Sequence, residues 1–182
     1  MHHLLDPASW KSLADWLAQR GQKAFRAAQI LSEQDKHEEA EAAFAKLAKD
    51  GTASYRSLAR LREAAELARH DPKAAVEMYD DIARNGALGP VIQDLAALRA
   101  GYVLVDTAPY DEMNRRIEPL TAADRAFHHS ARALMALAAW RADDVKAAKR
   151  WFDMIMADRD TPESTRSQVE MLNALFAGEG KS

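Results

Sequence analysis

Apolar residues recur along the chain at the spacing of one face of a helix, and short polar turns separate the apolar stretches. The turns carry Asp, Gly, Asn or Pro, residues that suit the end of one helix and the start of the next. The pattern predicts about ten helices. They are expected near residues 7–19, 22–34, 37–49, 54–70, 73–86, 90–106, 110–120, 124–142, 145–158 and 162–177.

One short pattern returns at nearly constant intervals. It consists of a small residue, three spacers and a bulky apolar residue, which places the pair on one helical face. The bulky residues follow one another at intervals of 35, 38 and 35 positions, and the third copy is the least regular. The four copies are Ala40–Phe44, Ala75–Tyr79, the stretch near Met113–Ile117, and Ala148–Phe152.

A second pattern repeats in the helix that precedes each of these pairs. Leu58–Arg62 returns as Leu95–Arg99 after 37 residues, and Ser130–Leu134 follows after 35 more. The alanines at equivalent positions are Ala59, Ala96 and Ala131. A small residue at such a position lets paired helices approach, and the aromatic of the first pattern fills the gap that remains.

Paired helices at intervals of about 34 to 37 residues are the signature of tetratricopeptide (TPR) repeats. The early Trp and the Gly that usually closes the first helix are missing, so the repeats are degenerate. The sequence predicts an all-α fold, a TPR-like right-handed α-solenoid of antiparallel helix pairs. Residues 21–177 are expected to form this repeat domain, residues 1–20 an N-terminal extra helix, and residues 178–182 a frayed tail.

Composition supports the helical class. Of 182 residues, 38 are Ala and only 16 are Val, Ile or Thr, a balance that nearly excludes a β-sandwich or a doubly wound sheet. A net charge of −3 argues against a nucleic-acid-binding domain. Because Cys is absent, disulfides, thiolate zinc sites and cysteine nucleophiles are excluded.

Neither a membrane span nor a signal peptide is recognisable, so the chain as given is expected to be soluble. Met1-His2-His3 is either a natural start or the remainder of an expression tag. In the second case, a membrane anchor could have preceded the chain.

Few residues suggest catalysis or metal binding. His37-Glu38-Glu39-Ala40-Glu41 resembles the zinc motif H-E-x-x-H, but Glu41 replaces the second His, which favours a charged first turn of a helix. His128 and His129 are neighbours that point about 100° apart on a helix, and neither has a carboxylate at i+4. No glycine-rich phosphate loop or nucleophile motif occurs. We predict no enzymatic activity, no cofactor and no metal site.

Four arginines are candidate protein-binding residues. Arg62 and Arg99 occupy equivalent repeat positions, and Arg56 and Arg132 lie on the same class of helix. The first helices of TPR repeats line a groove, in which basic residues can hold acidic peptide groups or a C-terminal carboxylate. The alternative is a solvated face with ion pairs to nearby glutamates.

Three segments carry a family resemblance. Asp50–Ala64, Ala75–Ala83 and Leu95–Asp106 resemble the bacterial TPR-like ancillary subunit of the SecYEG translocon, in its alphaproteobacterial branch, and the similarity extends from about Gln22 to Leu175. The resemblance implies a non-catalytic scaffold, anchored by one span in the inner membrane, whose repeats face the periplasm and contact the translocon and periplasmic chaperones. The family's span is absent here, and the family has no catalytic residues to transfer.

Other functions stay open. The chain could be a cytosolic TPR-type regulatory adaptor, or an enzyme or ligand-binding helical domain whose site has no sequence signature. The expected partners are protein or peptide segments. Nucleic acid is not expected as a partner, and a membrane is expected only through an anchor absent from this chain.

Overall fold

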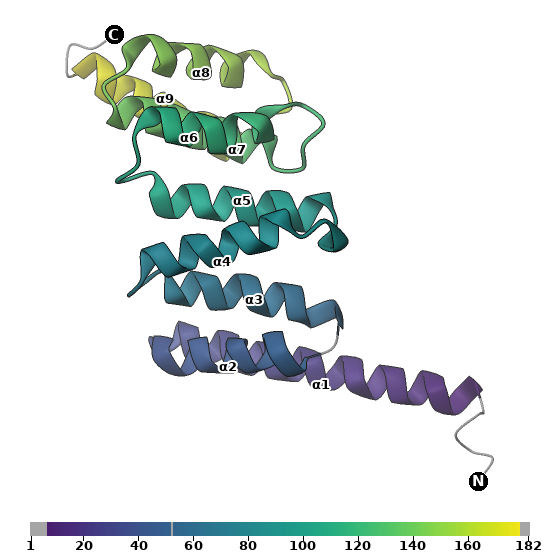
Figure 1. The fold of residues 1–182 in the computed structure, drawn as a ribbon. Helices are drawn as coiled ribbons and strands as arrows, with labels where there is room; N and C mark the ends of the chain where they lie inside the picture. The colour runs from purple at the N-terminus through teal and green to yellow at the C-terminus, as the bar shows by residue number, and fades with distance from the viewer. Residues whose placement is uncertain (1–6, 52, 179–182) are drawn as a thin grey trace. The chain divides into compact units, whose positions relative to one another are not determined.

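Helices make up nearly all of the structure, a computed structural model that describes residues 7–51 and 53–178 (Figure 1). These ranges contain nine α-helices, two short 3-10 turns and no strand, which confirms the predicted all-α class. The 3-10 turns are η2 (Gly86–Leu88) and η3 (Glu118–Thr121). The helices are α1 (Pro7–Glu33), α2 (His37–Asp50), α3 (Ala53–Leu67), α4 (Pro72–Arg84), α5 (Pro90–Leu104), α6 (Tyr110–Ile117), α7 (His128–Arg141), α8 (Val145–Ala157) and α9 (Glu163–Gly178).

The first helix differs from its prediction. The predicted break between 7–19 and 22–34 is wrong, because α1 runs for 27 residues without interruption. Gly21 lies at the expected break, but one Gly inside a helix costs only about 1 kcal/mol relative to Ala, which the helix formers around it offset. From Pro7 onward, the predicted N-terminal extra helix is thus continuous with the next. Met1–His3 and, apart from Gly178, the predicted tail lie outside the described residues.

Two compact units make up the chain, Met1–Met78 and Tyr79–Ser182, and the division between them falls within α4. We call them the N-terminal unit and the C-terminal unit. No helix in the described part of the chain combines the length and the apolar character that crossing a bilayer requires.

In the N-terminal unit, α2 packs against both α1 and α3. α2 buries Ala40 and Phe44 on one face, and the ring of Phe25 from α1 meets the ring of Phe44 edge to face, with 5.5 Å between centroids. The facing helices contribute Ala28 and Ala59, both fully buried. Small residues therefore bring the three backbones together, and the aromatic pair fills the space that remains.

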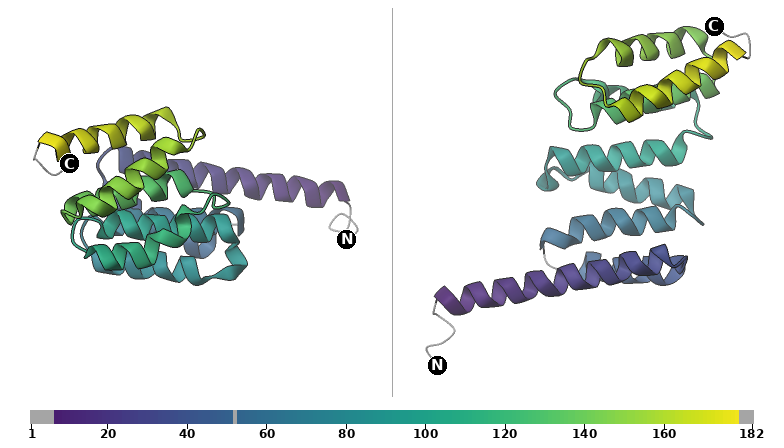
Figure 2. Two further views of the ribbon diagram at one scale, coloured as in Figure 1. Left: turned by 90° about the horizontal axis from the view of Figure 1, so that it is seen from above. Right: turned by 180° about the vertical axis from the view of Figure 1, so that it is seen from behind.

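In the C-terminal unit, α7 is the central helix and contacts α5, α6, α8 and α9 (Figures 1 and 2). Every residue from Ala131 to Ala136 is buried, so α7 presents almost no solvent-exposed face along this stretch. Trp151 and Ile155 from α8 and Val169 from α9 complete this core.

The repeated positions predicted from the sequence are mostly buried. Ala59, Ala96 and Ala131 are all inaccessible to solvent. Three of the four predicted pairs are also buried on their helices. These pairs are Ala40–Phe44, Ala75–Tyr79 and Met113–Ile117.

The fourth pair is wrong by one residue. Ala147 and Trp151 are both 3% exposed, whereas Ala148 and Phe152 are only partly buried. Trp151 is held inside because its indole Nε1 donates a hydrogen bond to the Tyr110 hydroxyl at 2.9 Å. The larger aromatic therefore fills the core, and Phe152 turns toward the side of α8 that faces α9.

Gly101 marks a close approach of α5 to the rest of the C-terminal core. A Cβ at this position would lie 2.6 Å from Ile117 Cδ1 and 2.9 Å from Leu134 Cδ2. Both neighbours are buried and have little room to move.

Gly101→Ala is therefore expected to lower the free energy of unfolding by about 1–2 kcal/mol, because overpacking outweighs the gain in helix propensity. Urea denaturation measures the change. Gly86→Ala is the control, since nothing lies within 4 Å of its added Cβ. A Gly101→Ala protein as stable as the unchanged chain would contradict this packing.

Candidate protein-interaction site

The predicted arginines of α3 differ in their surroundings. Arg56 is exposed. Arg62 is half-buried, and its guanidinium carbon lies 5.2 Å from the centre of the Phe44 ring, within range of a cation–π interaction. Its Nε is buried and has no hydrogen-bond partner among the described residues. Arg62 thus covers the core of the N-terminal unit and keeps part of its donor capacity unused.

The two predicted arginines of the C-terminal unit lie in opposite environments. Arg99 is exposed on α5. Arg132 is 7% exposed, and it donates from Nε to the Thr121 carbonyl at 3.0 Å and from a terminal nitrogen to Asp158 Oδ2 at 2.8 Å. The Arg132 guanidinium is therefore committed to contacts inside the unit, whereas Arg56 and Arg99 present their charge to solvent.

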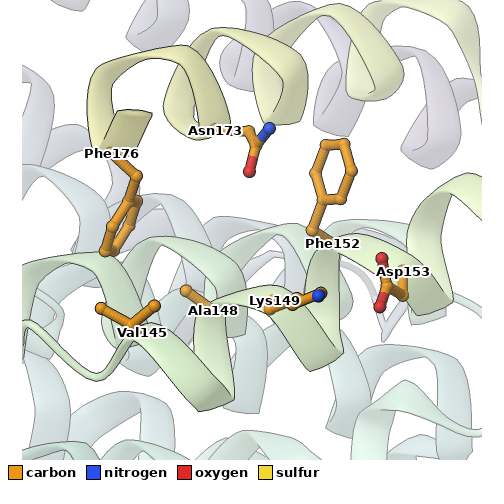
Figure 3. Close-up of a pocket in the computed structure, with 7 residues that line it drawn as sticks. All are labelled: Val145, Ala148, Lys149, Phe152, Asp153, Asn173 and Phe176. Atoms are coloured by element: carbon orange, nitrogen blue, oxygen red, sulfur yellow. The ribbon is translucent and has the colours of Figure 1, made fainter. Parts of the chain in front are cut away.

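A pocket of about 230 Å³ lies between α8 and α9 (Figure 3). Phe152 projects from α8 and Phe176 from α9, at opposite ends of the gap, while Val145 and Ala148 line its α8 side. The ring of Phe176 is braced by the ring of Trp140, edge to face, with 6.1 Å between centroids. The apolar walls of the pocket are thus held by the core behind them.

Polar groups surround these apolar walls. Lys149 and Asp153 belong to α8, and Asn173 extends from α9 into the gap between the two phenylalanine rings (Figure 3). The pocket therefore combines an apolar surface with an ammonium, a carboxylate and an amide. Such a site can hold one apolar side chain and bind the polar groups on either side of it.

The shape of the pocket follows from the one-residue shift in α8. Because Trp151 occupies the core position, Phe152 is free to form a wall of the pocket. No sequence motif marks Val145 or Asn173, which meet only when α8 and α9 pack together. The sequence feature that could have indicated this pocket is the adjacent aromatic pair Trp151-Phe152. Neighbouring residues on a helix point in different directions, so only one of these two side chains can face the core.

An acidic groove of about 630 Å³ lies along α2 and the end of α3 in the N-terminal unit. Its lining residues are His37, Glu38, Glu41, Ala42, Ala45, Glu63 and His70. Partial burial raises the pKa of the Glu63 carboxyl, although the charge of Arg60 acts in the opposite direction. The segment that resembles H-E-x-x-H forms one wall of this groove.

Glu66 is the buried centre of a small polar cluster beside the groove. It is 5% exposed and accepts hydrogen bonds from the Ser32 hydroxyl and from His37 Nδ1, the latter at 2.8 Å. In a catalytic triad the His stands between the hydroxyl and the acid, whereas here the acid stands between the other two. The cluster joins α1, α2 and α3 without the geometry that would activate Ser32.

His70 is expected to titrate above its ordinary pKa of 6.5, because its Nε2 bonds the Glu41 carboxylate at 2.7 Å. Since the folded pKa is raised, this bond stabilises the fold below pH 6.5 and is lost as pH rises through the raised value. An NMR titration of the imidazole protons measures the pKa, and Glu41→Gln should lower it. A His70 pKa at or below 6.5 in the unchanged chain would contradict the pairing.

Comparisons with protein-family models, curated proteins and solved structures found no match for this chain.

Proposed function

We propose that the chain is a non-catalytic protein-interaction scaffold built from TPR-like helix pairs, and that it binds polypeptide segments. The pocket between α8 and α9 carries the proposal. Its phenylalanine walls would take one apolar side chain of a partner, and the polar groups of Lys149, Asp153 and Asn173 would bind the partner's backbone or an adjacent charge.

The size of the pocket favours a side chain over a cofactor. Sites for small molecules usually enclose roughly 300–1,000 Å³. At about 230 Å³, this pocket falls below that range but can hold an aliphatic or aromatic side chain. The pocket also offers groups of both charge signs and an amide, which complement the N–H and C=O groups of a peptide.

The buried alanines support the TPR-like architecture within this proposal. Ala59, Ala96 and Ala131 recur at the predicted intervals and are fully buried, as close helix pairing requires. α1 packs against α2 and α7 against α8, and each of these is one of the predicted helix pairs. A right-handed solenoid is the arrangement that we propose for these pairs.

The family resemblance supplies the proposed partners and location. By this resemblance the scaffold would act on the periplasmic side of the bacterial inner membrane and contact the translocon and periplasmic chaperones. Arg56 and Arg99, which are exposed, would then bind acidic groups on those partners.

The experiment compares two aspartate substitutions at matched positions. Val145 is the first residue of α8 and borders the pocket. Val91 lies in the first turn of α5 and does not border it. Val145 is 36% exposed and Val91 is 53% exposed. Both positions accept a carboxylate in the first helical turn, where the helix dipole favours it. Proteins are captured from detergent-solubilised membranes of the cells that encode the unchanged chain. The capture is carried out with the unchanged chain, with Val145→Asp and with Val91→Asp.

We expect the unchanged chain and Val91→Asp to retain translocon subunits or chaperones, and Val145→Asp to lose them. Equal capture by all three proteins would overturn the pocket as the binding site. Capture of unrelated proteins that Val145→Asp abolishes would support the scaffold and overturn the translocon assignment. No capture by the unchanged chain would overturn protein binding itself.

A further inference from the structure

A cluster of three potential metal ligands lies in the C-terminal unit, and none of the three lines the pocket between α8 and α9. His128 and His129 begin α7, and Asp158 follows the last residue of α8. One ligand atom from each of the three lies within 4.8 Å of the other two. The two imidazole rings are 4.0 Å apart between centroids and inclined by 42°. The sequence separates these groups, but the start of α7 and the end of α8 bring them together.

The hydrogen bonding of the His128 imidazole leaves one of its ring nitrogens available to a metal. Its Nδ1 lies 2.7 Å from the carbonyl oxygen of Arg125. Because a carbonyl only accepts hydrogen bonds, Nδ1 carries the proton, and Nε2 is left with a free lone pair. Most metal-binding histidines are held in this way, with one ring nitrogen donating to a carbonyl or carboxylate and the other facing the metal.

His129 contributes a nitrogen that lacks a partner. Its Nδ1 is buried and has no hydrogen-bond partner among the described residues. A buried polar atom without a partner is unusual and is explained when an ion or water occupies the site.

Asp158 supplies an ionised carboxylate. The backbone N–H of Asp160 donates to Oδ1 at 2.9 Å and Arg132 donates to Oδ2 at 2.8 Å, so the carboxylate is held in a fixed orientation. Each carboxylate oxygen keeps a second lone pair for a further interaction.

Arg132 influences which ion the cluster can accept. Its positive charge offsets the charge of Asp158, so hard cations that depend on several carboxylates, such as Mg²⁺ and Ca²⁺, are disfavoured. Ions that bind neutral imidazole strongly depend less on carboxylate charge, and Zn²⁺ commonly takes two or three His ligands with a carboxylate.

We propose that His128, His129 and Asp158 bind one divalent transition-metal ion, with Zn²⁺ the best fit to this ligand set. Bonds of about 2.0–2.2 Å to each ligand require the three groups to close by roughly an ångström from their present spacing. The ion would connect the start of α7 to the segment between α8 and α9, and it would stabilise the C-terminal unit by binding only the folded form.

The test starts from a protein in which His2 and His3 are replaced by Ala, so that they cannot bind metal. Zn²⁺ is titrated into this protein by calorimetry, and thermal unfolding is followed with Zn²⁺ and with Mg²⁺. We expect one Zn²⁺ per chain and a higher Tm with Zn²⁺ alone. His129→Ala should weaken Zn²⁺ binding at least about tenfold, as expected for loss of a ligand. His70→Ala, the control in the other unit, should leave it unchanged.

A second measurement does not depend on the folding of the variants. Diethyl pyrocarbonate modification of the reference protein, read by mass spectrometry, reports which histidines Zn²⁺ protects. Protection of His128 and His129, with His37 and His70 still reactive, supports the site. Protection of His37 and His70 instead, or no saturable Zn²⁺ binding, would overturn it.

Discussion

Replacing Tyr79 with Ala is expected to lower the free energy of unfolding by about 3–5 kcal/mol, the usual cost of removing a large buried aromatic side chain. Tyr79 is 2% exposed and lies one interval after Phe44 in the repeated pattern. Because Ala75 and Tyr79 occupy one face of α4, loss of the ring leaves a cavity that neighbouring side chains fill only in part. Equilibrium denaturation in urea, monitored by far-UV circular dichroism, measures the change.

Tyr102→Ala is the matched control for this prediction. Tyr102 carries the same side chain on α5 but is 45% exposed. Its removal should cost under about 1 kcal/mol, since an exposed site leaves little cavity. If the two substitutions cost the same, Tyr79 does not occupy a core position, and the register assigned to the repeats is wrong.

Arg125→Ala is expected to lower the free energy of unfolding by about 2–3 kcal/mol, because it breaks a partly buried ion pair. Arg125 forms a two-pronged ion pair with Asp94, at 2.8 Å from Nε and 2.7 Å from a terminal nitrogen. The Asp94 side chain is only 9% exposed, so removal of Arg125 leaves a buried carboxylate without its partner. The 37% exposure of Arg125 keeps the loss below that of a fully buried pair.

Two further variants identify the source of that loss. Arg125→Lys keeps the charge but cannot reproduce the two-pronged geometry. Its stability should therefore fall between that of the unchanged chain and that of Arg125→Ala. Arg84→Ala breaks the exposed pair with Asp81, whose side chains are 70% and 55% exposed, and should cost under about 1 kcal/mol. Thermal and urea denaturation of all four proteins check the order. An Arg125→Ala protein as stable as Arg84→Ala would show that Asp94 is not desolvated.

The helical periodicity of this sequence predicted the all-α class and most of the helix positions. Helix positions from His37 onward agree with the structure within a few residues, because short polar turns separate clearly amphipathic stretches. The alanines at repeated positions were predictable for the same reason: Ala59, Ala96 and Ala131 recur where two backbones approach. Both features depend on residues close together in the sequence, which a single chain displays directly.

Features that depend on distant residues were not predictable. Arg132 matched the pattern of a groove residue, but Asp158 and the Thr121 carbonyl, 26 and 11 positions away, hold it inside the unit. The choice between Trp151 and Phe152 for the core depended on the hydroxyl of Tyr110, on another helix. The pocket of α8 and α9 follows from that choice, so its residues carry no motif of their own.

Site-specific photo-crosslinking tests the central claim most directly, that the pocket of α8 and α9 binds a polypeptide. A photoreactive phenylalanine derivative is placed at Val145 in one full-length protein and at Val91 in another, and each is irradiated in the cells that encode the chain. We expect a discrete crosslinked protein from position 145, none from position 91, and loss of the product when Asn173 is also replaced by Ala. No crosslink from position 145, or equal crosslinking from both positions, would contradict the claim.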